Sequence, residues 1–167
     1  MIEDVQIPSE GLVFRALPRI DYGDAFQRRL ASVLPASAEG VARELFHSTP
    51  GWVGGLMRTR DWIVRGFGLK TTPVTTGKEF EVGALRPGQT VGLFRVYENT
   101  PRELVLGQDD RHLDFRLSVL VQQVEDVRVV TLSTVVQFNN WWGRAYFLPV
   151  KLFHKRIVRA MLGRLRG

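Results

Sequence analysis

The side chains best suited to chemistry gather in one short stretch of the sequence, residues 109–116. Its polar members are Asp109, Asp110, Arg111, His112, Asp114 and Arg116. An aspartate beside a histidine can take up and release protons as a general acid–base pair, here at the mouth of a cavity. The favoured interpretation is a hairpin turn, because aspartates cap turns. In that case Asp114 points outward from a strand whose Phe115 and Leu117 point inward.

Glu98 is a further candidate acid, at the end of an apolar and partly alternating stretch over residues 90–98. Phe94 and Val96 share one face of this predicted strand, and Glu98 falls on the same face. Glu98 is therefore either a buried acid in a cavity or an exposed strand end. The turn that follows at residues 99–101 favours the exposed end.

Other kinds of site are excluded by what the sequence lacks. The chain contains no cysteine, which excludes disulfides, thiolate nucleophiles and cysteine-ligated zinc. Its three histidines, His47, His112 and His154, lie in different predicted elements without the spacing of metal ligands, so we predict no metal site. No motif of a serine hydrolase, zinc protease, P-loop or dinucleotide-binding fold is present, so we predict no cofactor.

Charge is divided unevenly along the chain, whose net charge is +6. Residues 1–126 hold 15 Lys and Arg against all 17 Asp and Glu, whereas residues 127–167 hold eight basic residues and no acid. The basic end is interpreted as a solvated helix face; the alternatives are docking on an acidic protein partner or on an anionic membrane surface. Nucleic acid is not an expected partner, because the sequence has no recognition motif and no aromatic–basic platform.

The first half of the chain is predicted to be mostly helical. Residues 12–17 form a strand, and residues 21–34 form a helix whose apolar positions recur at spacings of three and four. These positions are Tyr22, Phe26, Leu30 and Val33. A second helix over residues 38–47 and a third over residues 49–67 follow, each behind a capping side chain. An edge strand is predicted at residues 78–85.

The second half changes to the two-residue period of strands, over residues 90–98, 103–107, 112–123 and 128–138. Because the links between these strands are short, neighbouring strands are predicted to be antiparallel.

A long terminal helix then begins behind Asn139 or Asn140. Its apolar stripe is Tyr146, Val150, Phe153, Ile157, Met161 and Leu165. Pro149 predicts either a kink or a helix start near it. Since the core needs this stripe, the helix is not expected to serve as a free membrane anchor. The tryptophans Trp141 and Trp142 either pin the helix to the rim of the sheet or stack on a ligand.

Three stretches resemble the uncharacterised bacterial family called domain of unknown function 2867. They are HSTPGWVGGLMRTRDWIVRGFGL at residues 47–69, LGQDDRHLDFRLSV at residues 106–119 and GRAYFLPVKLFHKRIVRAML at residues 143–162. That family looks related to the START and polyketide-cyclase superfamily, in which a seven-stranded antiparallel sheet grips a C-terminal helix around a hydrophobic cavity. The resemblance implies this helix-grip fold. It also implies lipid, sterol or polyketide binding, with cyclisation or hydrolysis in some members, but carries over no catalytic residues.

We therefore predict one α+β domain over residues 1–167, a helix-grip fold whose curved antiparallel sheet wraps around a long C-terminal helix, with short helices after the first strand. The start of the sequence does not resemble a secretory signal and no apolar run is long enough to span a bilayer, so a cytoplasmic location is expected.

The predicted function is binding of a hydrophobic small molecule or lipid in an internal cavity, by burial of apolar surface. The predicted cavity residues are Trp62 near the mouth, Phe94, Val96, Phe115, Leu117, Val119, Phe153 and Ile157. A shift of one residue in the strands would exchange the two faces. The alternatives are a polyketide-cyclase-like enzyme that uses His112, Asp114 or Glu98 to move protons, and an interaction module that docks through the basic helix.

Overall fold

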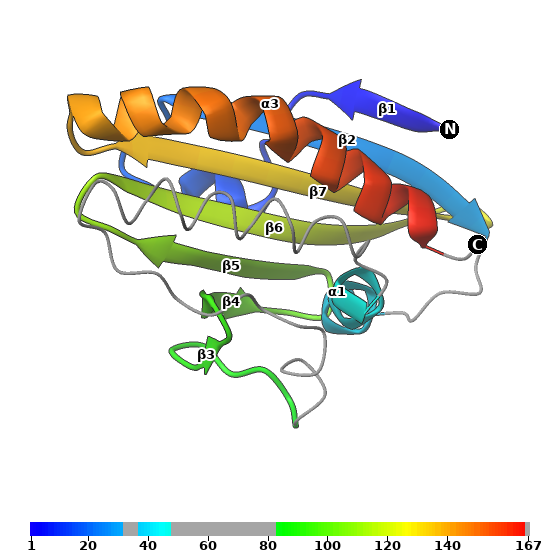
Figure 1. The fold of residues 1–167 in the computed structure, drawn as a ribbon. Helices are drawn as coiled ribbons and strands as arrows, with labels where there is room; N and C mark the ends of the chain where they lie inside the picture. The colour runs from blue at the N-terminus through cyan, green and yellow to red at the C-terminus, as the bar shows by residue number, and fades with distance from the viewer. Residues whose placement is uncertain (32–36, 48–82, 166–167) are drawn as a thin grey trace.

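The computed structural model describes residues 1–31, 37–47 and 83–165, which form a seven-stranded antiparallel sheet with its α-helices packed on one face (Figure 1). The strands are β1 (Ile2–Val5), β2 (Tyr22–Ala31), β3 (Thr90–Val91), β4 (Phe94–Asn99), β5 (Glu103–Asp109), β6 (Leu113–Val124) and β7 (Val127–Phe138). The helices are the 3-10 helix η1 (Leu12–Arg15), α1 (Ala38–His47) and α3 (Trp141–Arg164). The predicted α+β class, with a curved antiparallel sheet and a long C-terminal helix, is confirmed, and the fold is helix-grip-like.

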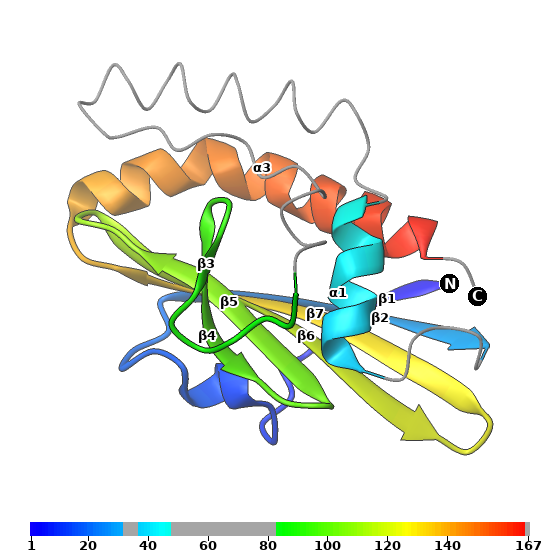
Figure 2. The same cartoon turned by 90° about the horizontal axis from the view of Figure 1, so that it is seen from below.

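The strand order is β1-β2-β7-β6-β5-β4-β3, so the predicted meander of the second half is confirmed. Strands β4 to β7 follow one another antiparallel, and β6 and β7, the two longest, form the centre of the sheet. Helices α1 and α3 lie on one face, here called the inner face, and η1 lies on the opposite, outer face (Figure 2).

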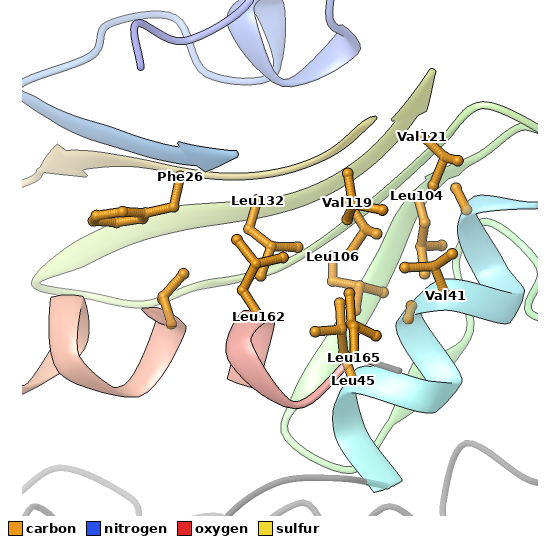
Figure 3. Packing of buried hydrophobic residues seen from close by; sticks show 14 of the residues in the cluster. Phe26, Val41, Leu45, Leu104, Leu106, Val119, Val121, Leu132, Leu162 and Leu165 are labelled. Atoms are coloured by element: carbon orange, nitrogen blue, oxygen red, sulfur yellow. The ribbon is translucent and has the colours of Figure 1, made fainter. Parts of the chain in front are cut away.

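The main core lies between the inner face and the two helices (Figure 3). Leu106, Val119 and Leu132 point from three neighbouring strands toward Leu162 on α3 and Leu45 on α1. Burying a leucine side chain stabilises a fold by about 1.5–3 kcal/mol, so this layer accounts for the attachment of both helices.

The predictions for residues 12–17 and 21–34 are wrong. Residues 12–17 contain the 3-10 helix η1, not a strand, and most of residues 21–34 form strand β2, not a helix. β2 pairs with β7 along its whole length and with β1 on its other side. The apolar spacing of four between Tyr22, Phe26 and Leu30 equals two strand periods, so it fits a strand as well as a helix. Val33 lies outside the described residues.

Helix η1 is held to the outer face by a buried acid of β5. The carboxylate of Glu103, 3% exposed, accepts the N–H of Leu12 at 2.6 Å, the N–H of Val13 at 3.1 Å and the hydroxyl of Ser118 at 2.6 Å. The first N–H groups of a helix have no partners within it, so this carboxylate caps η1 from about 90 residues away in the sequence.

Helix α1 confirms the prediction for residues 38–47, and the hydroxyl of Ser37 accepts the N–H of Gly40 at 3.1 Å at its start. Glu39, in its first turn, forms an ion pair with Arg43, accepts from the side chain of Asn99 at 2.8 Å and accepts the N–H of Leu85 at 3.3 Å. Burial raises the pKa of the Glu39 carboxyl, but these hydrogen bonds and the Arg43 charge outweigh burial and leave its pKa below the ordinary value.

Helix α3 begins at Trp141 behind the predicted cap Asn140, whose side chain accepts the N–H of Gly143 at 3.0 Å. The helix continues through Pro149, so a start near that residue is wrong. A Cβ added at Gly143 would overlap the carbonyl oxygen of His112, so the bare backbone lets the helix start touch β6.

The buried side of α3 differs from the predicted stripe. Its buried residues are Gly143, Phe147, Val158 and Leu162. Of the predicted stripe, only Leu165 is fully buried, and Phe153 is exposed.

The C-terminal end of α3 is held by Arg28 of β2, which donates to the carbonyl oxygens of Leu162, Gly163 and Leu165 at 2.8–2.9 Å.

The predictions for residues 49–67 and 78–82 lie outside the described residues, and residues 83–85 are not in a strand. Among the helices that the structure describes, none combines the length and the apolar character needed to cross a membrane.

Candidate functional site

Part of the inner face is lined by apolar side chains that the chain covers only partly. Phe46 of α1, Phe94 of β4 and Phe115 of β6 form a row, with ring centroids 5.6 and 6.1 Å apart. Phe94, Phe115 and the neighbouring Leu117 are half-buried. Leu117 lies in the register between Leu106 and Thr134, both of which are buried. A partly covered leucine in the middle of a buried layer marks apolar surface that other atoms can still contact.

Polar side chains lie on the same face, one strand beyond Thr134. Asp24 of β2 pairs with Thr134 in the register, and its carboxylate accepts the hydroxyl of Tyr22 at 2.5 Å. Its other oxygen lies 3.2 Å from Nε2 of His154 on α3. The side chains of Asp24 and His154 are 8% and 18% exposed. Tyr22 also packs in one cluster with Phe115 and Phe147, so the polar group adjoins the apolar row.

Burial raises the pKa of the Tyr22 hydroxyl, and its hydrogen bond to Asp24 and the charge of that carboxylate raise it further. Tyr22 therefore remains protonated and continues to donate to Asp24 at neutral pH. The ammonium group of Lys151 lies 4.9 Å from the centre of the Tyr22 ring, which gives the site a nearby cation.

The pair of Asp24 and His154 has the geometry of a carboxylate that orients an imidazole. Such a pair can hold a polar group of a ligand by hydrogen bonding, or it can move a proton as a general acid and base. Sequence reasoning missed these residues because residues 21–34 were assigned to a helix. The signal that could have revealed Asp24 is its place between Tyr22 and Phe26 on the core-facing side of a strand.

The acid–base candidates of the alternative, enzymatic interpretation lie elsewhere. His112 hydrogen-bonds through Nδ1 to the side chain of Asn140, the cap of α3. Asp114 accepts from the N–H of Asp110 at 3.0 Å and from the side chain of Asn139 at 3.1 Å. Both side chains therefore hold together the start of β6 and the chain just before α3. Among the contacts of the described residues, His112 and Asp114 do not hydrogen-bond to each other.

Glu98 is exposed, as the following turn indicated. A β-bulge between Val96 and Glu98 shifts the strand by one position, so that Glu98 pairs with Val105 instead of continuing the inner face.

The predicted cavity residues are placed at different depths. Val96 and Val119 are fully buried in the main core, whereas Phe94, Phe115 and Leu117 are half-buried. On α3, Ile157 is half-buried and Phe153 is exposed, and Trp62 lies outside the described residues. The predicted strand residues therefore share the inner face, although they are buried to different extents.

A second polar cluster lies on the outer face. The guanidinium of Arg116 lies 3.6 Å from the centre of the Tyr97 ring and 2.7 Å from the carboxylate of Asp109. Burial raises the pKa of Tyr97, and its hydrogen bond to Asp109 raises it further. Arg116 is itself buried and adjoins no half-buried apolar row, so we interpret this cluster as structural. Within the described ranges, no three side chains of His, Cys, Asp or Glu gather so that they could hold a metal ion.

Comparison with known proteins gives a family but no activity. No curated protein matches the chain. The family described as "Protein of unknown function (DUF2867)" matches residues 16–161. This range includes strands β2 to β7, the polar pair and most of α3. Because the match covers most of the chain, the chain belongs to this family of proteins of unknown function.

Proposed function

We propose that the chain binds an apolar small molecule or lipid on the inner face of its sheet, against Phe94, Phe115 and Leu117. The observation that carries this proposal is the half-burial of these three side chains beside fully buried neighbours. Covering exposed apolar surface gains about 25 cal/mol for each Å² removed from water, which supplies the affinity. The helix-grip-like fold also supports the proposal, because the START and polyketide-cyclase superfamily, which the sequence resembles, has this fold and binds such ligands.

The placement of α3 supports the same site. Lys151 and Arg159 contact Tyr22 of β2 and Asp4 of β1, so that side of the helix faces the β1 edge of the sheet. Phe153 and Ile157 lie on the opposite side of the helix, by its period of 3.6 residues, toward β6 and β5. An apolar ligand on Phe115 and Leu117 would therefore meet apolar side chains of the helix as well.

The proposed role of Asp24 and His154 is to orient the ligand through one polar group, a hydroxyl or carbonyl. Buried polar groups need hydrogen-bond partners, so a ligand without such a group would bind more weakly beside them.

The proposal is tested by filling the site. Leu117→Trp places a larger ring over the half-buried patch, and Val124→Trp, at an exposed position of the same strand, is the matched control. The probe is N-phenyl-1-naphthylamine, whose fluorescence rises in an apolar site. We expect Leu117→Trp to weaken probe binding at least about tenfold, and Val124→Trp to leave it unchanged. Equal binding by the wild type and Leu117→Trp, with both folded, would refute the site.

The distance between Asp24 and His154 also favours a second candidate function, an enzyme that transforms its bound ligand by proton transfer. Native mass spectrometry of wild type and His154→Gln, purified alike, compares the molecules that each retains. An enzyme predicts that the variant retains a substrate that differs in mass or chromatographic retention from the molecule in the wild type. The same molecule in both supports binding without turnover through His154.

A further inference from the structure

Helix α3 has a second apolar surface, which is exposed. Trp141, Leu148 and Leu152 are 63%, 68% and 71% exposed. In an α-helix these positions, i, i+7 and i+11, fall on one side. Around the helix that side lies about 110° from Phe147 and Val158, which face the core, and Arg159, at i+18, continues it toward Asp4 of β1. We call Trp141, Leu148 and Leu152 the outer stripe of α3.

Basic side chains flank the outer stripe. Arg144 and Lys155 lie along one edge of it and Arg156 lies at its end, and all three are exposed. No acid occurs anywhere in residues 127–167, so every charged side chain of the helix itself is basic, and Asp4 of β1 pairs with Arg159 at 2.9 Å. Exposed leucine and tryptophan between lysines and arginines is the pattern of a helix that lies in the interface of a membrane.

The charge of this surface selects its partner. A second copy that docks through the same surface, as in a symmetric dimer, would bring the same positive charge against it. Residues 48–82 of the chain hold five Lys and Arg against three Asp and Glu, so this segment does not complement the surface either. A bilayer with anionic lipids offers both an apolar layer for the outer stripe and negative charge for its basic flanks.

We propose that the outer stripe of α3 docks on the surface of an anionic lipid bilayer, with the helix axis parallel to the membrane plane. Leu148, Leu152 and Trp141 enter the boundary between headgroups and acyl chains, where tryptophan is favoured. Arg144, Lys155 and Arg156 lie against the anionic headgroups. From the sequence, this helix is not expected to be a free membrane anchor, because its apolar stripe is assigned to the core. The proposal differs because the outer stripe is a separate apolar surface that remains exposed.

The experiment is sedimentation of the full chain with sucrose-loaded vesicles of phosphatidylcholine alone or of phosphatidylcholine with phosphatidylglycerol. We expect binding to the anionic vesicles, stronger than to neutral ones by roughly a hundredfold, since each basic side chain near the surface adds about fivefold. Added salt should weaken this binding.

Three variants separate the parts of the proposal. Leu148→Ser with Leu152→Ser should reduce binding to anionic vesicles at least about tenfold, because it removes the apolar contact. Lys155→Glu with Arg156→Glu should remove the preference for anionic lipid. Phe14→Ser, at an exposed apolar side chain of η1, is the control that should bind as the wild type does. An unchanged unfolding midpoint in urea shows that each variant is folded.

Two results would overturn the proposal. One is a wild type that stays in the supernatant with both kinds of vesicle; the other is a double serine variant that binds as tightly as the wild type. Light scattering addresses a second copy: a dimer that dissociates in the double serine variant would show that the outer stripe is a dimer interface instead. Loss of vesicle binding leaves the ligand site at Leu117 untouched, so the two proposals fail independently.

Discussion

The buried carboxylate of Glu103 gives the sharpest test of how the outer face is assembled. Replacing it by alanine removes the acceptor for two backbone N–H groups, of Leu12 and Val13, and for the hydroxyl of Ser118. Each buried donor left without a partner costs about 1–3 kcal/mol. The three together give an expected loss of about 3–9 kcal/mol, a large part of the 5–15 kcal/mol that ordinarily holds such a fold together.

The assay is urea unfolding of wild type, Glu103→Ala and Glu103→Gln. The glutamine variant keeps one oxygen as an acceptor, but its amide nitrogen replaces the oxygen that accepts from Leu12, so we expect an intermediate loss of about 1–3 kcal/mol. Hydrogen exchange locates the effect, because the amides of Leu12 and Val13 should exchange faster relative to those of β6.

Glu98→Ala is the matched control, an exposed acid of the neighbouring strand, and it should change stability by no more than about 0.5 kcal/mol. If Glu103→Ala costs no more than Glu98→Ala, the carboxylate does not hold η1 and the reasoning is refuted.

Three further predictions concern the attachment of the two helices. Glu39→Gln should lower the free energy of unfolding by about 1–2 kcal/mol at neutral pH. Because the pKa of the Glu39 carboxyl in the folded protein lies below the ordinary 4.5, the difference from the wild type should vanish as the pH falls through that folded pKa. Urea unfolding across the acid range measures this difference. Gly143→Ala should cost about 2–3 kcal/mol because its Cβ overlaps a β6-side carbonyl, whereas Gly163→Ala on the same helix, whose Cβ has room, should be neutral or stabilising in thermal unfolding. Arg28→Met should cost about 1–2 kcal/mol and speed amide exchange in the last turn of α3; unchanged exchange there would count against its capping role.

Strand β2 shows why prediction from the local sequence pattern failed in the first half of the chain. Its inner face carries Tyr22, Asp24, Phe26, Arg28 and Leu30, so polar residues interrupt the alternation that marks a strand. Both polar residues have partners on α3, more than a hundred residues away: His154 for Asp24 and the terminal carbonyl oxygens for Arg28. These partners cannot be recognised before the fold is known, and the same two residues made the apolar spacing resemble that of a helix.

Helix α3 shows a different limit. Its start behind Asn140 follows from local capping chemistry and was predicted, as was helix α1. Its buried side was not, because the first half of α3 is apolar on nearly every side, and both Phe147 and Leu148 fit a core position. Packing against the sheet selects Phe147 and leaves Leu148 exposed. The strands β4 to β7 were predicted because their alternation is regular and their links are short.

The candidate site follows the same division. The inner-face positions of Phe115, Leu117 and Val119 could be read from strand alternation alone. The pair of Asp24 and His154 could not, because it joins a strand and a helix that only the tertiary fold brings together. The most polar stretch of the sequence, which drew attention to His112 and Asp114, instead builds a turn and the start of α3.

The place of β2 in the sheet also has a consequence for folding during synthesis on the ribosome. β2 precedes its partner β7 by roughly a hundred residues, and synthesis at about 5–20 residues per second takes roughly 5–20 s to cover that length. Throughout that interval Phe26 and Leu30 have no β7 to pair with and no α3 to cover them. We expect the apolar side chains of β2 to remain accessible to chaperones until the second half of the chain emerges. Codon changes that slow translation between β2 and β7 should lengthen the time for which these side chains are exposed.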